Sequence, residues 1–265
     1  MSVSNNTLTV DPSNAAFDPL AAGETRSIAV SYTVNDGHGG SVTTSETITV
    51  TGTNDVPQIT NASSALHGAV TEDSTTGHLV ASGQLSAVDV DHGATQTWTA
   101  DHTQGVYGAL SLDPSTGAWT YTLANDSAVV QKLAGGEQHT ESFEVTVSDG
   151  LGGTQTQTVV VEVNGTNDKP VLTVSSNTTP VQQGQADGVD LLTASATDID
   201  NPQSDIHFSL GAGAHAPVGG TTYFEIDPSS GHLSLTKAGA AAIAADPVGN
   251  WNVEVIASDG HGGTD

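Results

Sequence analysis

The chain has 265 residues, with 4 Lys and Arg against 30 Asp and Glu, and its net charge at pH 7 is −26. Nucleic acid and anionic membrane surfaces are therefore disfavoured as partners, because both are bound chiefly through basic side chains, whereas metal cations are favoured. The absence of cysteine excludes disulfides and thiolate metal sites. No apolar run approaches the roughly 18 residues of a membrane span, so membrane insertion is not expected.

An internal repeat organises the sequence. Asp-Gly-x-Gly-Gly begins at Asp36, Asp149 and Asp259, at separations of 113 and 110 residues. Such a period is typical of a tandem array. Three further motifs recur in the same order, namely Gly-Thr-Asn-Asp-x-Pro, Asp-x-Asp and Asp-Pro-Ser-x-Gly.

The repeat predicts three domains. Residues 1–55 are the C-terminal half of a truncated repeat, residues 56–168 form a complete repeat, and residues 169–265 form a repeat that lacks its last strand. The polar opening does not have the form of a signal peptide. We interpret the sequence as a piece of a longer array.

In chain order, the apolar alternation predicts strands at residues 27–34, 47–50, 77–90, 95–100, 109–112, 118–123, 141–148, 159–163 and 252–257. Alternation with a period of two and one apolar face indicates half-buried antiparallel strands. Each Asp-Gly-x-Gly-Gly follows one such strand and predicts a hairpin turn. Residues 125–133 are compatible with one short helical turn.

The number and spacing of these elements favour one architecture. Some seven short strands in about 110 residues, with turns every 8–12, are typical of a β-sandwich. A unit of that size can bury a core of its own. We predict an all-β chain of sandwiches in tandem, joined by short linkers, and the regular alternation argues against a disordered chain.

Two acidic sets recur in register and predict metal sites at the linkers. Calcium takes six to eight oxygen ligands, mostly carboxylates and carbonyls. Asp-x-Asp at a strand end and the Asp before each Gly-rich turn would face the preceding Asn-Asp-x-Pro linker in a Greek-key sandwich. The first predicted site contains Asn54, Asp55, Asp89, Asp91 and Asp149. The second contains Asn167, Asp168, Asp198, Asp200 and Asp259.

Each motif taken alone has a simpler interpretation. Asp-Gly is a common hairpin turn, and Asp often hydrogen-bonds nearby backbone groups. Asn-Asp-x-Pro also suits an ordinary polar linker. The joint recurrence of the motifs favours calcium, because bunched carboxylates without a counter-ion repel one another.

The motif order resembles cadherin repeats. Asp-Gly-x-Gly-Gly followed by Gly-Thr-Asn-Asp-x-Pro is most similar to the VCBS and cadherin-like repeats of large RTX-type bacterial adhesins. The resemblance covers essentially the whole chain. It implies immunoglobulin-like Greek-key sandwiches, calcium at the linkers, and export by type I secretion with a signal at the far C-terminus.

The same resemblance adds two candidate ligands. In cadherins, an acidic residue near the start of a repeat and another in its middle complete the linker site, and Glu72 and Asp126 match these positions in the second site. The third repeat departs from the pattern, because Val181-Gln182-Gln183-Gly184 replaces the Glu-Asp pair. A linker after Asp265 would therefore bind calcium less well, and the departure puts the role of Glu72 in doubt.

Other signals favour structural roles. The turn histidines His38 and His261 have Leu151 at the matching position, which argues against a ligand role. Asp89 and Asp91 imitate a glycosidase pair, but an active site repeated every 110 residues or so is implausible, so no enzyme is predicted. The tryptophans, at positions 98, 119 and 251, lie in strand runs and favour core positions over sugar stacking.

These observations predict a calcium-rigidified extender of a secreted bacterial surface adhesin, extracellular and engaged in cell adhesion and biofilm formation. Its partners would be calcium ions, neighbouring repeats, and a cell-surface glycan or protein. Two alternatives stay open. One is a glycan- or protein-binding module, for which the divergent loop at residues 211–220 is a candidate. The other is an accessory domain of a secreted polysaccharide-degrading enzyme.

Overall fold

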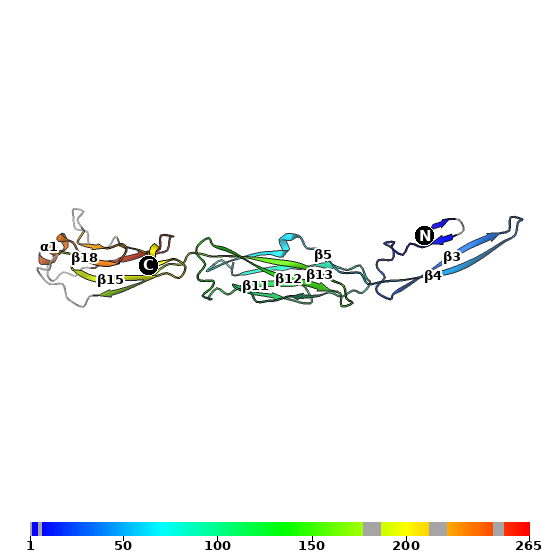
Figure 1. Cartoon of the computed structure of the whole chain (residues 1–265), viewed down its shortest axis with the longest axis horizontal. Helices are drawn as coiled ribbons and strands as arrows, with labels where there is room; N and C mark the ends of the chain where they lie inside the picture. The colour runs from blue at the N-terminus through cyan, green and yellow to red at the C-terminus, as the bar shows by residue number, and fades with distance from the viewer. Residues whose placement is uncertain (1, 5–6, 177–186, 212–221, 246–251) are drawn as a thin grey trace. The chain divides into compact units, whose positions relative to one another are not determined.

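The computed structural model describes residues 2–4, 7–176, 187–211, 222–245 and 252–265 (Figure 1). It divides into two compact units. Unit 1 comprises Met1–Ala69, Val80–Leu123 and Thr140–Glu162, and unit 2 comprises Val70–Leu79, Ala124–His139 and Val163–Asp265. Segments of the predicted repeat 56–168 thus belong to both units.

Strands dominate the described residues. Up to residue 66 the elements are β1 (Ser2–Ser4), β2 (Thr7–Thr9), β3 (Thr25–Asn35), β4 (Ser41–Thr51), β5 (Gln58–Ile59) and the 3-10 helix η1 (Ser63–Leu66). Then follow β6 (His67–Thr71), β7 (Val80–Gln84), β8 (Ala87–Val88), β9 (Thr97–Ala100), β10 (Gly108–Leu112), β11 (Ala118–Leu123), β12 (Gln138–Ser148) and β13 (Thr154–Asn164).

The remaining elements belong to unit 2. They are β14 (Val171–Ser176), β15 (Asp190–Thr197), the 3-10 helix η2 (Gln203–Asp205), β16 (His207–Leu210), β17 (Phe224–Ile226), β18 (His232–Leu235), α1 (Lys237–Ala245) and β19 (Val255–Ser258). No helix among the described residues is long and apolar enough to cross a membrane.

Two sheets form the sandwich that carries most of the core of unit 1. One has the order β10-β11-β7 and the other β6-β13-β12-β9. Alternate residues of β11 and β12 are buried, as the apolar alternation predicts. The core includes two of the three tryptophans predicted to be buried, Tyr121 on β11 and the apolar face of β12: Trp98, Trp119, Tyr121, Phe143, Val145 and Val147. The prediction of a β-sandwich is confirmed.

A second sandwich lies in unit 2, with the sheets β14-β15-β18-β17 and β16-β19. One part of its core contains Phe208 and Ala257, and another contains Phe224, Leu233 and Leu235. Trp251, residues 212–220 of the divergent loop and the segment around Gln183 fall outside the described residues.

The turns follow the predicted chemistry. Gly117 and Gly231, at the ends of the two Asp-Pro-Ser-x-Gly turns, have φ of 73° and 69°, a left-handed conformation that favours glycine. Asp113 stabilises its turn by accepting bonds from the Ser115 and Thr116 backbone N–H groups.

Two local predictions were wrong, and one helix was missed. The strand expected at 77–90 is split, because β7 pairs with β11 whereas β8 pairs with β5, and the chain changes sheets between them. The strand expected at 252–257 begins only at Val255, where its pairing with β16 begins. The Ala-rich helix α1 was not predicted, although alanine has the highest helix propensity.

The segment 125–133 forms turns rather than a regular helix. The Gln131 N–H donates to the Ser127 carbonyl over 3.0 Å, which is a single α-type bond. The Ser127 hydroxyl accepts from the Val130 N–H over 3.3 Å. This segment brings Asn125 and Gln131 to the site described below.

Candidate metal centre

The Gly-rich turns hold their leading aspartates by the same bonds in each copy. Asp149 Oδ1 accepts the N–H groups of Leu151 and Gly153 over 2.7 and 3.0 Å. Asp259 Oδ1 accepts those of His261 and Gly263 over the same two distances. Because Oδ1 is used by the turn, Oδ2 of each aspartate is directed to other partners.

The first acidic cluster, in unit 1, consists of Asn54, Asp55, Asp89, Asp91 and Asp149. Asn54 Nδ2 donates to Asp149 Oδ2 over 2.7 Å. The Asp55 N–H donates to Asp91 Oδ2 over 2.9 Å, and the Asp91 N–H donates to Asp89 Oδ1 over 3.0 Å. These bonds bring together all five residues predicted for the first site.

The second acidic cluster, in unit 2, consists of Glu72, Asp73, Asn167, Asp168, Asp198, Asp200 and Asp259. It repeats the first arrangement. Asn167 Nδ2 donates to Asp259 Oδ2 over 2.8 Å, the Asp168 N–H donates to Asp200 Oδ2 over 3.4 Å, and the Asp200 N–H donates to Asp198 Oδ1 over 3.2 Å. The five residues predicted from the repeat again lie together.

Glu72 and Asp73 extend the second cluster. Glu72 is fully buried, and its Oε2 accepts the Thr166 N–H over 3.2 Å. Asp73 has a φ of 50°, a strained conformation for a residue other than glycine. Ligand oxygens of Glu72, Asp73 and Asp168 lie within 4.8 Å of one another. Asn125 Nδ2 donates to Asp73 Oδ1 over 2.7 Å and so stabilises this conformation of Asp73.

Several oxygens in the clusters are buried without a hydrogen-bond partner. Five such side-chain atoms are found among the described residues, and all belong to the clusters: Asn54 Oδ1, Asp89 Oδ2, Asp91 Oδ1, Asp168 Oδ2 and Asp198 Oδ2. A buried polar atom without a partner costs free energy. An all-oxygen set of carboxylate and amide groups suits a hard cation such as Ca²⁺, which would satisfy these atoms.

Burial and mutual repulsion perturb the carboxyl groups. Burial raises the pKa of Glu72 to about 7, and nearby Asp168 and Asp73 add to the increase. Burial, together with the charges of Asp73 and Asp200, raises the pKa of Asp168 to about 6. Burial also raises the pKa of Asp55, which faces Asp91, Asp18 and Asp89. Charge crowding of this kind is relieved by a bound cation.

The aspartates of the Gly-rich turns behave in the opposite way. The hydrogen bond from Asn54 lowers the pKa of Asp149. Burial acts to raise the pKa of Asp259, but the bonds from Asn167, His261 and Gly263 together lower it. At neutral pH each cluster therefore contains one charged turn carboxylate, Asp149 in the first and Asp259 in the second.

The structure does not place Asp126 with the second cluster in the way the sequence suggested. Asp126 is exposed in its turn, and the residues that contact Asp73 are its neighbour Asn125 and Gln131, whose Nε2 donates to Asp73 Oδ1 over 3.1 Å. Neither Asn125 nor Gln131 is acidic, and no motif in the sequence singled them out.

Asp73 and Asn201 were also missed. Asp73 stands beside Glu72 in the sequence, and this adjacency was the signal that could have found it. Asn201 Nδ2 donates to Asn167 Oδ1 over 3.1 Å and to Asp200 Oδ1 over 2.7 Å. The first cluster has His92 at the position that follows Asp-x-Asp, so the sequence repeat gave no signal for Asn201.

Comparison with protein families gives one match. Residues 54–165 match the model described as a bacterial cadherin-like domain, a range that includes the whole first acidic cluster. A search of curated proteins found no match.

Solved structures of cadherin domains resemble this chain at low sequence identity. The chain is 17% identical to protocadherin gamma B2 extracellular cadherin domains 1-5, with a TM-score of 0.51, over 91% of this chain and 43% of that one. It is 18% identical to human CDH23 EC21-23, with a TM-score of 0.48, over 90% and 72%. For mouse cadherin-23 EC22-24 the values are 21% and 0.45, over 80% of this chain and 64% of that one.

Proposed function

Since this chain carries a cadherin-like repeat region with immunoglobulin-like sandwiches in tandem, we propose that it is a calcium-stiffened extender of a secreted bacterial adhesin. Cadherin-like domains of this kind are non-catalytic structural modules of adhesion. The finer proposal concerns how the two acidic clusters act. Each would bind Ca²⁺ between a linker and the sandwich that follows it.

One observation carries the proposal. The five buried side-chain oxygens that lack hydrogen-bond partners among the described residues all belong to the two clusters, and two of them, Asp89 Oδ2 and Asp198 Oδ2, occupy equivalent positions of the sequence repeat. A folded chain tolerates such atoms poorly unless another group satisfies them. Ca²⁺ would satisfy them and would neutralise the crowded carboxylates.

The mechanism would be mechanical. In the first cluster, Asn54 and Asp55 come from the linker, whereas Asp89, Asp91 and Asp149 come from the following sandwich. An ion held by both groups would fix the linker. Extracellular modules bind Ca²⁺ with dissociation constants of roughly 10⁻⁴–10⁻³ M, so the chain would be loose at intracellular calcium levels and stiff outside the cell. Extracellular localisation and type I export belong to this proposal.

The decisive test is a calcium titration of the whole chain, followed by calorimetry and small-angle scattering. We expect saturable calcium binding. With calcium bound, the distribution of interatomic distances in the whole chain, measured by scattering, should become narrower. The variant that combines Asp89→Asn and Asp198→Asn should lose most of the binding. The matched control combines Asp113→Asn and Asp227→Asn, which lie in satisfied turns outside the clusters. Equal binding by the two double variants would overturn the proposal.

A further inference from the structure

The side-chain amide of Gln131 contacts the second acidic cluster much as a small cation would. Its Nε2 donates to Glu72 Oε1 over 3.3 Å, to Asp73 Oδ1 over 3.1 Å and to the Asn125 carbonyl over 3.1 Å. The three acceptors are two carboxylates and one backbone carbonyl, which are oxygen types that Ca²⁺ takes as ligands. The amide nitrogen therefore lies among oxygens that a bound ion would use.

The fold holds this amide in place without an ion. Gln131 is half-buried in the turn segment 125–133. Its neighbour Val130 and the nearby Leu133 are 0% and 4% exposed, and its backbone N–H donates to the Ser127 carbonyl over 3.0 Å. These contacts anchor the backbone on both sides of Gln131. The packing of the turn therefore directs the amide at the cluster in the calcium-free chain.

The amide satisfies only part of the cluster. Glu72 has both carboxylate oxygens paired, because Oε2 accepts the Thr166 N–H and Oε1 accepts Gln131 Nε2. Asp168 Oδ2, in contrast, is buried without a hydrogen-bond partner. Oxygens of Glu72, Asp73 and Asp168 nevertheless lie within 4.8 Å of one another, a spacing at which one ion could bind all three. The amide and a cation would therefore compete for the same carboxylates.

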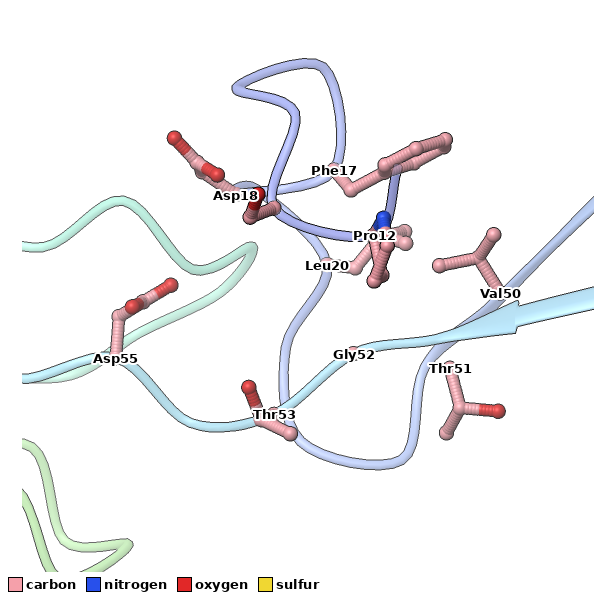
Figure 2. A pocket seen from close by; sticks show the side chains of 10 residues that line it. Pro12, Phe17, Asp18, Leu20, Val50, Thr51, Gly52, Thr53 and Asp55 are labelled. Carbon is pink, nitrogen blue, oxygen red and sulfur yellow. The ribbon is translucent and has the colours of Figure 1, made fainter. Parts of the chain in front are cut away.

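The equivalent position of unit 1 carries a carboxylate. Gln131 and Asp18 are 113 residues apart, which is the offset between the first two Gly-rich turns. The charge of Asp18 acts on the first cluster, since it is among the causes that raise the pKa of Asp55. Figure 2 shows the carboxylates of Asp18 and Asp55 on the same side of the pocket that they line. This position of the repeat therefore accepts an acidic side chain beside a cluster, where unit 2 has a donor amide.

We propose that Gln131 sets the calcium affinity of the second cluster by competing with the ion for Glu72 and Asp73. The inference rests on the proposed function, because it requires that this cluster bind Ca²⁺. In the calcium-free chain the amide hydrogens stabilise the two carboxylates. When these carboxylates bind an ion, the amide loses its acceptors, since Nε2 presents only hydrogens. The bonds lost on binding weaken the affinity, while the same bonds stabilise the fold at low calcium.

The test uses the whole chain with Asp89→Asn, which removes a carboxylate of the first cluster so that a calorimetric calcium titration reports mainly on the second. Gln131→Met removes the amide hydrogens, keeps the length of the side chain and adds no charge. We expect it to bind calcium about tenfold tighter, the factor that one hydrogen bond to a charged group supplies. In chelator its urea midpoint should be lower than that of the parent chain, and in saturating calcium the two midpoints should coincide.

The matched control is Gln84→Met, in unit 1. The Gln84 amide donates to the carbonyls of Leu85 and Thr116 and to no carboxylate. The same chemical change at this position should leave the calcium affinity unaltered, and it should change the urea midpoint equally in chelator and in calcium. A second variant, Gln131→Glu, places an acidic side chain where unit 1 has Asp18. It removes the amide and adds an oxygen ligand, so it should bind calcium tighter than Gln131→Met.

The outcomes separate this inference from the function on which it rests. If the unaltered chain binds no calcium, both are overturned. If it binds calcium but Gln131→Met binds with equal or lower affinity, Gln131 acts as an oxygen ligand or only positions the carboxylates, and the inference alone is overturned. The same conclusion follows if Gln131→Glu binds calcium no tighter than the parent chain, or if Gln131→Met lowers the urea midpoint equally with and without calcium.

Discussion

Asn54 joins its linker to Asp149 through a bond of 2.7 Å from Nδ2 to Oδ2, and Asn167 makes the same bond to Asp259 in unit 2 over 2.8 Å. The amide side chain therefore holds the strand-end aspartate, and its own Oδ1 faces the acidic cluster. In the first cluster this Oδ1 is buried without a hydrogen-bond partner. The contact explains why Asn rather than Asp occupies this linker position, since an amide can both donate to a carboxylate and offer an oxygen ligand.

We first predict that Asn54→Ala destabilises unit 1. Hydrogen bonds to charged groups contribute about 1.5–3 kcal/mol, so the free energy of unfolding should fall by an amount of that order. Urea denaturation followed by tryptophan fluorescence measures it, because Trp98 and Trp119 lie in unit 1. Asn35→Ala, at an exposed position of β3, is the control. A loss no larger than that of the control would contradict the role of the bond.

Removal of calcium should lower thermal stability. At one hundred times its dissociation constant, a ligand that binds only the folded state adds about 2.7 kcal/mol per site. Scanning calorimetry of the whole chain with calcium and with chelator measures the difference in unfolding temperature. Magnesium at the same concentration is the control, because it demands a tighter octahedral geometry and retains its waters. Equal midpoints with calcium and chelator would contradict calcium binding.

In chelator, stability should fall as the pH rises from about 4.5 to about 7. The pKa of Glu72 is raised from 4.5 to about 7 and that of Asp168 from 3.8 to about 6. Raised pKa values mean that the folded state binds more protons than the unfolded state within this window, so the free energy of unfolding decreases with pH. Urea midpoints across the window measure the slope.

The variant Glu72→Gln is the control for this slope. It removes the group with the larger perturbation and retains an oxygen that can accept the Thr166 N–H. The pH dependence should become shallower. Midpoints of the unaltered chain that rise with pH, or a slope unaffected by Glu72→Gln, would show that these carboxyl groups do not control the stability of the calcium-free chain.

Glycine at the last position of the second and third Gly-rich turns should be required for calcium binding by the clusters. A Cβ at Gly153 would lie 2.0 Å from Asp149 Oδ2 and 3.0 Å from the Asp55 carbonyl, and one at Gly263 would lie 2.1 Å from Asp259 Oδ2 and 2.8 Å from the Asp168 carbonyl. Gly153→Ala and Gly263→Ala should each weaken calcium binding, measured by calorimetric titration. Gly40→Ala is the matched control, because the three atoms nearest to its Cβ all belong to Asp36, which lies outside both clusters.

The buried carboxylate of Glu141, which lies outside both clusters, should contribute to the stability of the fold but not to calcium binding. Glu141 accepts hydrogen bonds from the Tyr121 hydroxyl and the backbone N–H groups of Val106 and Tyr107. Burial is the main cause that raises the pKa of Tyr121, and the hydrogen bond to Glu141 is the second. Glu141→Ala leaves buried donors unpaired, each costing about 1–3 kcal/mol, so urea denaturation should show a marked loss. Calcium affinity, measured on the folded variant, should stay unchanged.

The local sequence was sufficient for features that depend on neighbouring residues. The alternation of Phe143, Val145 and Val147 predicted a strand with one buried face, and the exposed fractions of 0–1% at these three residues confirm it. The repeated register predicted which aspartates lie together, because equivalent positions of homologous sandwiches must coincide. Asp113 and Gly117 define their turn within five residues, so no distant contact was needed to predict it.

The tertiary structure decided what depends on partners distant in sequence. The break between β7 and β8 follows from their pairing with β11 and β5, which no local pattern records. Asn125, Gln131 and Asn201 reach the second acidic cluster through folding and carry no charge that would single them out. The sequence by itself determined the repeat, the strands and which acidic residues lie together, because these are written in spacing and residue type. Only the folded chain decided which oxygens are buried without partners, because burial depends on the packing of segments far apart in the chain.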